Sequence, residues 1–244
     1  MEEVEYARMA ERESSYWWHV GRLRIIETYL QKATKGKKDV RILNVGCGTG
    51  GTLATLERYG TVDNVDGSDD AIAFMRQLGY TRVKKMDGMK LPYKDKAYDM
   101  VGAFDVLEHI KDDAAALKEW SRVLKDDGSI LITVPAYQWL WSGHDVALHH
   151  FRRYTTGRLK QVAVTAGLAA SKVSYAFIFS LPLVAGFRFM RQMAAAKAGS
   201  ETSYVDVPGW VNGMFTNFLY LEAKAHRYIP FPAGTSIIAS LRKE

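Results

Sequence analysis

Two hydrophobic periodicities alternate along the first part of the chain. Short continuous apolar runs, typical of strands that are buried on both faces, are followed by stretches whose apolar residues recur at helical spacing. The predicted strands cover residues 40–45, 61–65, 82–85, 98–104 and 129–134. The predicted helices cover residues 20–33, 52–59, 69–78 and 114–124. This alternation predicts an α/β fold with a doubly wound, mainly parallel sheet.

The pattern changes after Pro135. An aromatic and histidine-rich stretch leads into a predicted helix at 156–167 and a predicted strand at 172–177, and the last strand is predicted at 235–241. The segment between the last two strands is long, apolar and partly helical. We therefore interpret the chain as one domain with four parts, which are an N-terminal helical cap (1–39), a core (40–177), a helical insertion (178–234) and a last strand (235–244).

Composition narrows the class of protein. Of the 244 residues, 48% are hydrophobic and 25% are charged, as in an ordinary globular protein. Cys47 is the only cysteine, so neither an intrachain disulfide nor a cysteine-based zinc site is possible, and a cytoplasmic location is expected. The net charge of +6 is a mild basic excess, and nucleic acid is not an expected partner. No signal peptide or membrane span is expected, because the N-terminus is acidic and the most apolar stretch (175–189) contains Pro182 and Arg188.

A glycine-rich turn follows the first predicted strand. Gly46, Gly48 and Gly50 precede a helix, and glycines allow a ligand to approach the backbone beside the free N–H groups of a helix N-terminus. Asp66 ends the second predicted strand, where a carboxylate can bind the two hydroxyls of a ribose. Asp87 follows the third strand, in a place suited to an adenine amino group. The alternative is a tight turn that binds no ligand.

These residues belong to segments that resemble the motifs of class I S-adenosylmethionine (SAM) methyltransferases. Six segments match in family order, namely 42–50 (ILNVGCGTG), 65–68 (VDGS), 87–93 (DGMKLPY), 98–101 (YDMV), 104–109 (FDVLEH) and 124–129 (LKDDGS). Together they cover roughly residues 40–135. The resemblance implies a Rossmann-like, seven-stranded sheet, SAM as the methyl donor and S-adenosylhomocysteine as the product.

The resemblance also implies cofactor contacts. The residues that it places against SAM are Gly46, Cys47, Gly48, Asp66, Gly67, Asp87, Gly88 and Phe104. Asn44 departs from the family, which often has Asp or Glu there, and an amide lacks the charge of a carboxylate. N-terminal segments of such enzymes often cover the cofactor, so Trp18 and Arg22 are further cofactor candidates and Tyr16 is a candidate for the acceptor side. The alternatives are aromatic packing against the sheet edge and a solvated arginine.

Asp105, Glu108 and His109 share one face if their segment is helical. That geometry suits a divalent metal ion, and a few quinone-pathway methyltransferases resemble it with a metal. The same pattern is common among class I enzymes that use none, so no metal is expected.

The segment after the fifth predicted strand concentrates titratable residues. It resembles a recurring segment of a bacterial and archaeal subgroup, in which His-Asp is followed by His, basic residues and Tyr. A His–Asp pair can act as a general base toward an acceptor, so His144, Asp145 and His150 are the candidate catalytic residues. The candidate acceptor contacts are Trp139, His149, Arg153, Tyr154 and Phe179. The alternative is a buried polar network that fixes the loop.

The sequence thus predicts a SAM-dependent methyltransferase that moves a methyl group in line to an O, N or C nucleophile of a small, partly apolar or anionic acceptor. The alternatives are a macromolecular or lipid-linked glycan acceptor, and a SAM-binding module without catalysis. The insertion is interpreted as extra core, a homodimer face, a lid over the acceptor, or a surface helix on anionic lipid that gives peripheral membrane contact.

Overall fold

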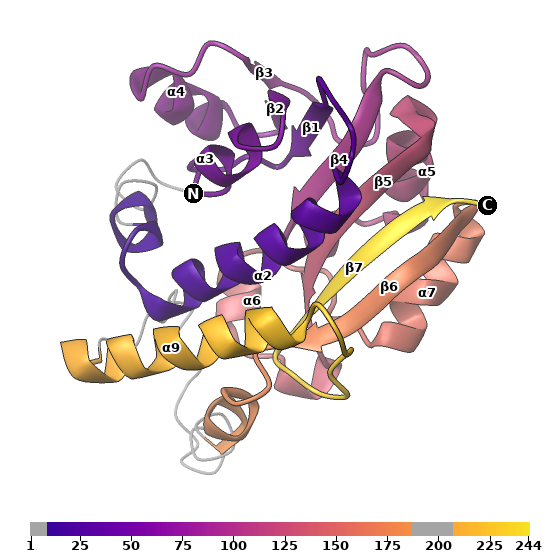
Figure 1. Cartoon of the computed structure of the whole chain (residues 1–244). Coiled ribbons are helices and arrows are strands. Elements are labelled where there is room, and N and C mark those ends of the chain that lie inside the picture. Colours follow the sequence, from indigo (N-terminus) through magenta and orange to yellow (C-terminus); the bar gives the residue numbers. More distant parts are fainter. Residues whose placement is uncertain (1–8, 187–206) are drawn as a thin grey trace.

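The computed structural model describes residues 9–186 and 207–244, and its centre is a sheet of seven strands (Figure 1). The strands are β1 (Arg41–Val45), β2 (Thr61–Asp66), β3 (Val83–Lys85), β4 (Tyr98–Phe104), β5 (Leu124–Pro135), β6 (Leu168–Ala176) and β7 (Ser236–Lys243). Their order is β3-β2-β1-β4-β5-β7-β6. The first five are parallel, and β7 pairs antiparallel with both β5 and β6. The predicted Rossmann-like, doubly wound sheet is confirmed.

Helices cover both faces of this sheet. They are α2 (Trp17–Ala33), α3 (Leu53–Glu57), α4 (Asp69–Gln77), α5 (Asp113–Val123), α6 (Gly143–Ala147), α7 (Thr156–Thr165) and α9 (Gly209–Ala225), with short 3-10 helices at Leu107–His109 and Gln138–Leu140. Two of them begin at side-chain caps: Asp112 accepts from the Ala115 N–H at 2.9 Å, and Thr155 accepts from the Arg158 N–H at 3.2 Å. Such caps satisfy N–H groups that have no partner within the helix.

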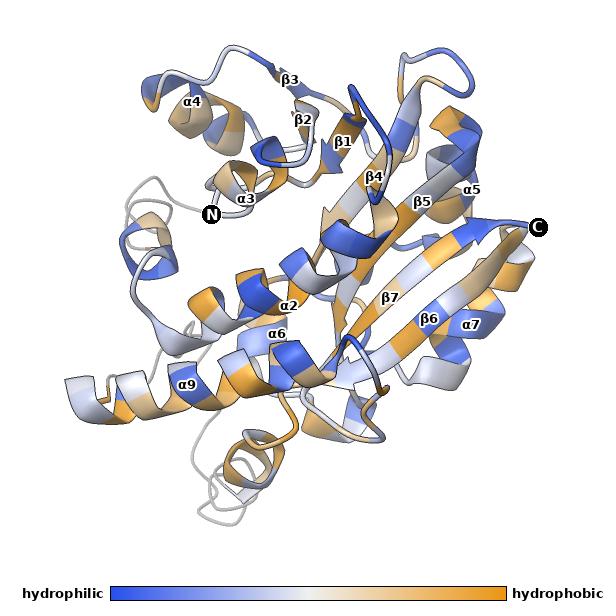
Figure 2. Ribbon diagram, viewed as in Figure 1, coloured by the Kyte–Doolittle hydropathy of each residue, from blue (hydrophilic) through white to orange (hydrophobic). Residues whose placement is uncertain are grey.

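Two apolar cores form because successive strand residues point to opposite faces. Ile42 and its neighbours pack under α2, α3 and α4, whereas Leu43 and its neighbours pack under α5 and α7. The central strands are therefore mainly apolar, and polar residues are concentrated in the connections (Figure 2). Trp120 of α5 is fully buried at the centre of the second core. Burial of each large side chain contributes about 1.5–3 kcal/mol.

The insertion before β7 packs along the N-terminal helix. Figure 1 shows α9 beside α2, and the Trp17 N–H donates to Asn212 Oδ1 at 2.9 Å. Gly21 allows this close approach, since a Cβ there would lie 2.0 Å from Leu219 Cδ1. Residues 1–8 of the predicted cap and 187–206 of the predicted insertion lie outside the described residues. Among the helices that are described, none is long and apolar enough to cross a membrane.

Candidate functional site

The glycine-rich turn lies at the carboxyl end of β1. Gly46, Gly48 and Gly50 have φ values of +69°, +51° and +86°, in the left-handed region that favours glycine. The Gly46 N–H donates to the Val65 carbonyl at 2.8 Å, which ties the turn to β2. A Cβ on Gly46 would lie 2.4 Å from Val106 Cγ2, whereas a Cβ on Gly48 would meet no atom within 4 Å. The Gly48 side of the turn therefore faces open space.

Asp66 connects the end of β2 to this turn. One of its carboxylate oxygens accepts the Gly48 N–H at 2.9 Å and the other accepts the Ser68 N–H at 2.9 Å. Each oxygen has a further lone pair for an added donor. Gly67 leaves room beside the carboxylate, since the nearest atom to an added Cβ would be the Met86 carbonyl oxygen at 3.9 Å. The structure thus places the predicted ribose-binding residues at one edge of the sheet.

The other predicted cofactor residues lie around the same strand ends. Asp87 accepts the Met89 N–H at 2.8 Å, and the Gly88 carbonyl accepts the Trp120 indole N–H at 2.8 Å, so the turn after β3 has a fixed shape. Cys47 is buried, and burial followed by the nearby Asp66 carboxylate raises the pKa of its thiol to about 12. Its thiol is therefore protonated and unreactive near neutral pH.

Phe104 and Asn44 occupy interior positions in the sheet. The Phe104 ring lies over Gly102 of its own strand, where an added Cβ would approach the ring to 2.8 Å. The Asn44 amide donates to Asn64 Oδ1 at 3.0 Å, and these two residues are register partners in β1 and β2. Asn44 is buried, so its side chain serves the pairing of the strands.

The N-terminal aromatic segment packs onto the carboxyl end of the sheet. Trp18 stacks on Phe177 with ring centroids 5.6 Å apart and planes 16° apart, and the Arg22 guanidinium lies over the Trp18 ring at 5.2 Å. Arg22 also forms an ion pair with Asp105, which immediately follows β4 and has a φ of +60°. Arg22 is therefore not a solvated arginine, and Asp105 is its counter-charge. Its contact with SAM stays a prediction. The ring of Tyr16 lies between those of Trp17 and His19.

Sequence reasoning missed a carboxylate that lies against the glycine-rich turn. Glu13 hydrogen-bonds the Thr49 hydroxyl, and its carboxylate occupies the space beside Gly51 that an added Cβ would need. Burial raises the pKa of Glu13. No signal in the sequence pointed to it, since it belongs to a polar N-terminal stretch with no apolar period.

The loop after β5 contains a buried acid with two partners. Asp145 is fully buried, hydrogen-bonds His150 Nδ1 at 2.9 Å, and accepts from Arg153 Nε at 2.7 Å and from its second guanidinium nitrogen at 3.0 Å. Burial alone would raise the pKa of Asp145, but the hydrogen bonds from His150 and Arg153 lower it. His150 is thus a histidine partner of Asp145.

His150 also belongs to a second cluster of polar side chains, together with Glu108 and His109. Glu108, His109 and His150 each place one ligand-type atom within 4.8 Å of the others, and the His109 and His150 ring centroids lie 4.6 Å apart. Desolvation of the ring, followed by the charge of His150, lowers the pKa of His109 to about 4, so its imidazole is neutral at pH 7. Asp105 was predicted to share a face with Glu108 and His109, but it turns toward Arg22.

The predicted acceptor residues do not form one surface. Trp139 is 63% exposed and stacks on Tyr137, His149 is exposed with a φ of +56°, and Phe179 lies in an aromatic cluster with Phe215. Arg153 is held by Asp145 as described above. Tyr154 is fully buried and donates its hydroxyl to Asp113 at 2.9 Å.

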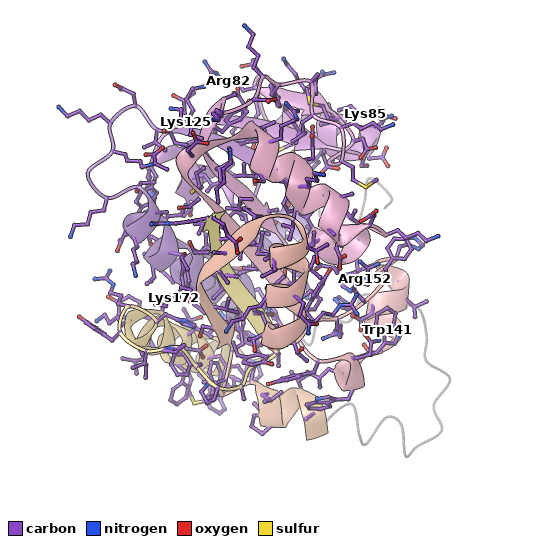
Figure 3. The ribbon with its side chains drawn as sticks, turned by 90° about the vertical axis from the view of Figure 1, so that its right-hand side faces the viewer. Arg82, Lys85, Lys125, Trp141, Arg152 and Lys172 are labelled. Atoms are coloured by element: carbon purple, nitrogen blue, oxygen red, sulfur yellow. The ribbon has the colours of Figure 1, made fainter. Side chains whose placement is uncertain are left out.

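Arg152 contributes to the same buried network. It forms an ion pair with Asp113 at 2.9 Å (Arg152 is labelled in Figure 3). Arg152, Arg153 and Tyr154 therefore fix the loop, as the alternative interpretation of this segment expected.

Comparison with known proteins agrees with this architecture. Residues 43–132 match the family described as methyltransferase domain. These 90 residues are therefore similar to a methyltransferase domain, and they hold the glycine-rich turn, Asp66 and Asp87. A probable S-adenosylmethionine-dependent methyltransferase of Mycobacterium tuberculosis is 31% identical over 133 residues, which cover 52% of this chain and 47% of that protein. The chain thus spans about half the length of the curated relatives it matches first.

Solved structures share the fold over nearly the whole chain. A chain of a complex that contains the Haloferax volcanii Trm112 methyltransferase activator has a TM-score of 0.63 at 16% identity, with 98% of this chain and 94% of that chain covered. The [4+2]-cyclase SpnF has a TM-score of 0.54 at 21% identity, with 90% and 81% covered. Likeness at such identities shows the fold alone. The fold is shared by a protein named for cyclisation, so the reaction must be argued from residues.

Proposed function

We propose that this chain binds SAM at the carboxyl ends of β1, β2 and β3 and transfers its methyl group to a small-molecule acceptor. The observation that carries the proposal is the arrangement of Asp66 beside a left-handed glycine turn whose Gly48 side faces open space. In open α/β sheets, ligands bind outside the carboxyl ends of the strands. Asp66 would bind the ribose hydroxyls, and Asp87 with the Gly88 backbone would bind adenine.

The chemistry needs little from the protein beyond alignment. The sulfonium of SAM is already an activated methyl donor, so holding an acceptor nucleophile in line with the S–CH₃ bond supplies most of the rate enhancement. An acceptor with an O–H or N–H group must also lose a proton. We assign its activation to the group around His150, whose ring Asp145 holds in a fixed orientation, with His144 in the same loop. Replacement of His150 by Ala should lower turnover about 10²–10⁴-fold if this group assists proton removal.

A lipid-linked acceptor is a second candidate, because the insertion exposes large apolar side chains. Trp210 and Leu221 of α9 are 75% and 60% exposed, and Leu183 is 55% exposed. Such side chains suit peripheral contact with a membrane. Sedimentation with anionic vesicles that Trp210→Ser abolishes would favour this acceptor class, and absence of sedimentation would favour a water-borne acceptor. A homodimer face on α9 would instead give a second-order concentration dependence in ultracentrifugation.

Calorimetry with S-adenosylhomocysteine tests the proposed cofactor site. Asp66→Asn keeps the shape of the side chain but removes charge-assisted hydrogen bonds worth about 1.5–3 kcal/mol, so affinity should fall about 10–150-fold. Asp63→Asn is the matched control, since Asp63 lies in the same strand and pairs with Arg41 at 3.3 Å and Arg82 at 3.6 Å. Equal affinities of the two folded variants would remove Asp66 from the site. Binding without turnover on any acceptor would leave a SAM-binding module.

A further inference from the structure

Glu108 is a buried carboxylate without a hydrogen-bond partner. Its side chain is 1% exposed, and neither Oε1 nor Oε2 has a partner among the described residues. An unpaired buried carboxylate costs several kcal/mol unless a cation or a proton neutralises it. Glu108 lies in the short 3-10 helix after β4, and its backbone is tied to the loop, because the Phe151 N–H donates to the Glu108 carbonyl at 2.8 Å.

The nearby charges are already paired with one another. Asp105 forms an ion pair with Arg22, and Asp145 forms a bidentate pair with Arg153 at 2.7 and 3.0 Å. Each pair is neutral as a whole. The charged form of Glu108 is therefore the group that needs a cation from outside the protein chain.

His109 and His150 complete a set of ligands around Glu108. The three ligand atoms lie within 4.8 Å of one another. The imidazole of His150 is oriented through one of its nitrogens, since His150 Nδ1 hydrogen-bonds Asp145 at 2.9 Å. Metal-bound histidines typically have a carboxylate or a backbone carbonyl on the other ring nitrogen. The remaining nitrogen of His150 is Nε2, on the side of the ring away from Asp145.

We propose that Glu108, His109 and His150 bind a divalent metal ion of the zinc type. Two imidazoles and one carboxylate are a known ligand set of catalytic zinc sites, which keep further positions for water or substrate. Ligand atoms about 2.0–2.2 Å from a shared ion lie roughly 3.4 Å apart in tetrahedral geometry, so atoms that now lie within 4.8 Å of one another would move closer by up to about 1.4 Å when the ion binds. His109 is exposed, and it provides the solvent-side entry.

The site differs from what the sequence pattern offered. The helical spacing grouped Asp105 with Glu108 and His109, whereas the fold replaces Asp105 by His150 from the loop after β5. That loop is the one to which we assign the acceptor, so a role of the ion in binding an acceptor oxygen rests on the proposed function. The existence of the metal site does not rest on it. The proposal departs from the expectation that no metal is used.

Zinc titration of metal-free protein against a chromogenic chelator tests the site. Wild type should bind one zinc ion, and Glu108→Gln should bind it at least about 100-fold more weakly, because removal of even an outer partner costs 10–100-fold. Asp145→Asn should weaken zinc by about 10–100-fold through the orientation of His150. The matched control is His149→Asn, which removes the adjacent imidazole at a φ of +56° that Asn tolerates. Its zinc affinity should stay within about threefold of wild type.

Thermal unfolding separates loss of the site from loss of the fold. Without zinc, Glu108→Gln should melt at or above the wild-type temperature, since it removes an unpaired buried carboxylate. With zinc, only wild type and His149→Asn should gain stability, because a ligand that binds the folded state stabilises it by mass action. Equal zinc affinity of wild type and Glu108→Gln, or no zinc binding by wild type, would overturn the metal site. Calorimetry with S-adenosylhomocysteine on the same metal-free sample reports the proposed function separately.

Discussion

Gly48→Ala should separate cofactor binding from folding. Gly48 has a φ of +51°, so an alanine there costs about 1–2 kcal/mol of unfolding free energy through its left-handed backbone. No atom lies within 4 Å of the added Cβ, so packing adds no further cost in the absence of ligand. The methyl group would instead occupy the open side of the turn. We expect at least a tenfold loss of affinity for S-adenosylhomocysteine, or about 1.4 kcal/mol.

Gly46→Ala is the matched comparison, because the methyl group added at this position would collide with a neighbouring side chain. Gly46 has a φ of +69°, and its Cβ would lie 2.4 Å from Val106 Cγ2. Overpacking adds about 1–3 kcal/mol to the backbone cost, for a total of roughly 2–5 kcal/mol. Adding Val106→Ala to the Gly46→Ala variant should recover the unfolding free energy that is lost to overpacking. The loss caused by the left-handed backbone should remain.

Urea denaturation and calorimetry with S-adenosylhomocysteine measure the two effects on each variant. Gly48→Ala should be folded, slightly less stable and poor at binding, and Gly46→Ala should be clearly less stable than Gly48→Ala. Wild-type affinity in Gly48→Ala would show that the open side of the turn is not where the ligand binds. Equal stabilities of the two variants would refute the packing argument.

Two further substitutions test buried polar groups. Burial, followed by the charges of Arg22 and Arg12, lowers the pKa of His19 to about 3. The unfolded chain takes up a proton below pH 6.5 and the folded chain does not, so His19 should cost the protein about 2 kcal/mol of stability between pH 7 and pH 5. His19→Phe should flatten that part of the pH profile in urea denaturation, and parallel profiles would contradict the burial argument. Tyr154→Phe should lose about 2 kcal/mol through the bond to Asp113 but keep turnover; normal stability with lost turnover would make Tyr154 an acceptor contact.

The sequence predicted the parallel half of the fold well because both faces of those strands are buried. β4 (Tyr98–Phe104) begins and ends at the predicted residues and β1 begins one residue late, whereas β5 begins at Leu124, five residues before its predicted start. β6 begins at Leu168 rather than at 172, since it is an edge strand whose first half alternates between buried and more exposed positions. Apolar periodicity reports burial, so it marks central strands more sharply than edge strands.

The sequence predicted site residues only where their positions follow from the order of the strands along the chain. Asp66 and Asp87 follow strands, and the carboxyl ends of parallel strands meet at one edge by topology. The pairing of Asp145 with His150 and the approach of His150 to Glu108 depend on how the loop after β5 folds back. That loop has a residue with positive φ, His149, immediately before His150. Helical spacing around Glu108 could not show this, because the third partner comes from another segment.

Helix α2 joins the parts of the molecule that the sequence treated separately. Gly21 receives Leu219 of the insertion, and Arg22, the next residue, pairs with Asp105 at the end of β4. Adjacent residues on a helix differ in direction by about 100°, so one turn of α2 contacts both the insertion and the carboxyl edge of the sheet. The contacts of α2 thus connect the insertion to the edge of the sheet where Asp66 and Glu108 lie.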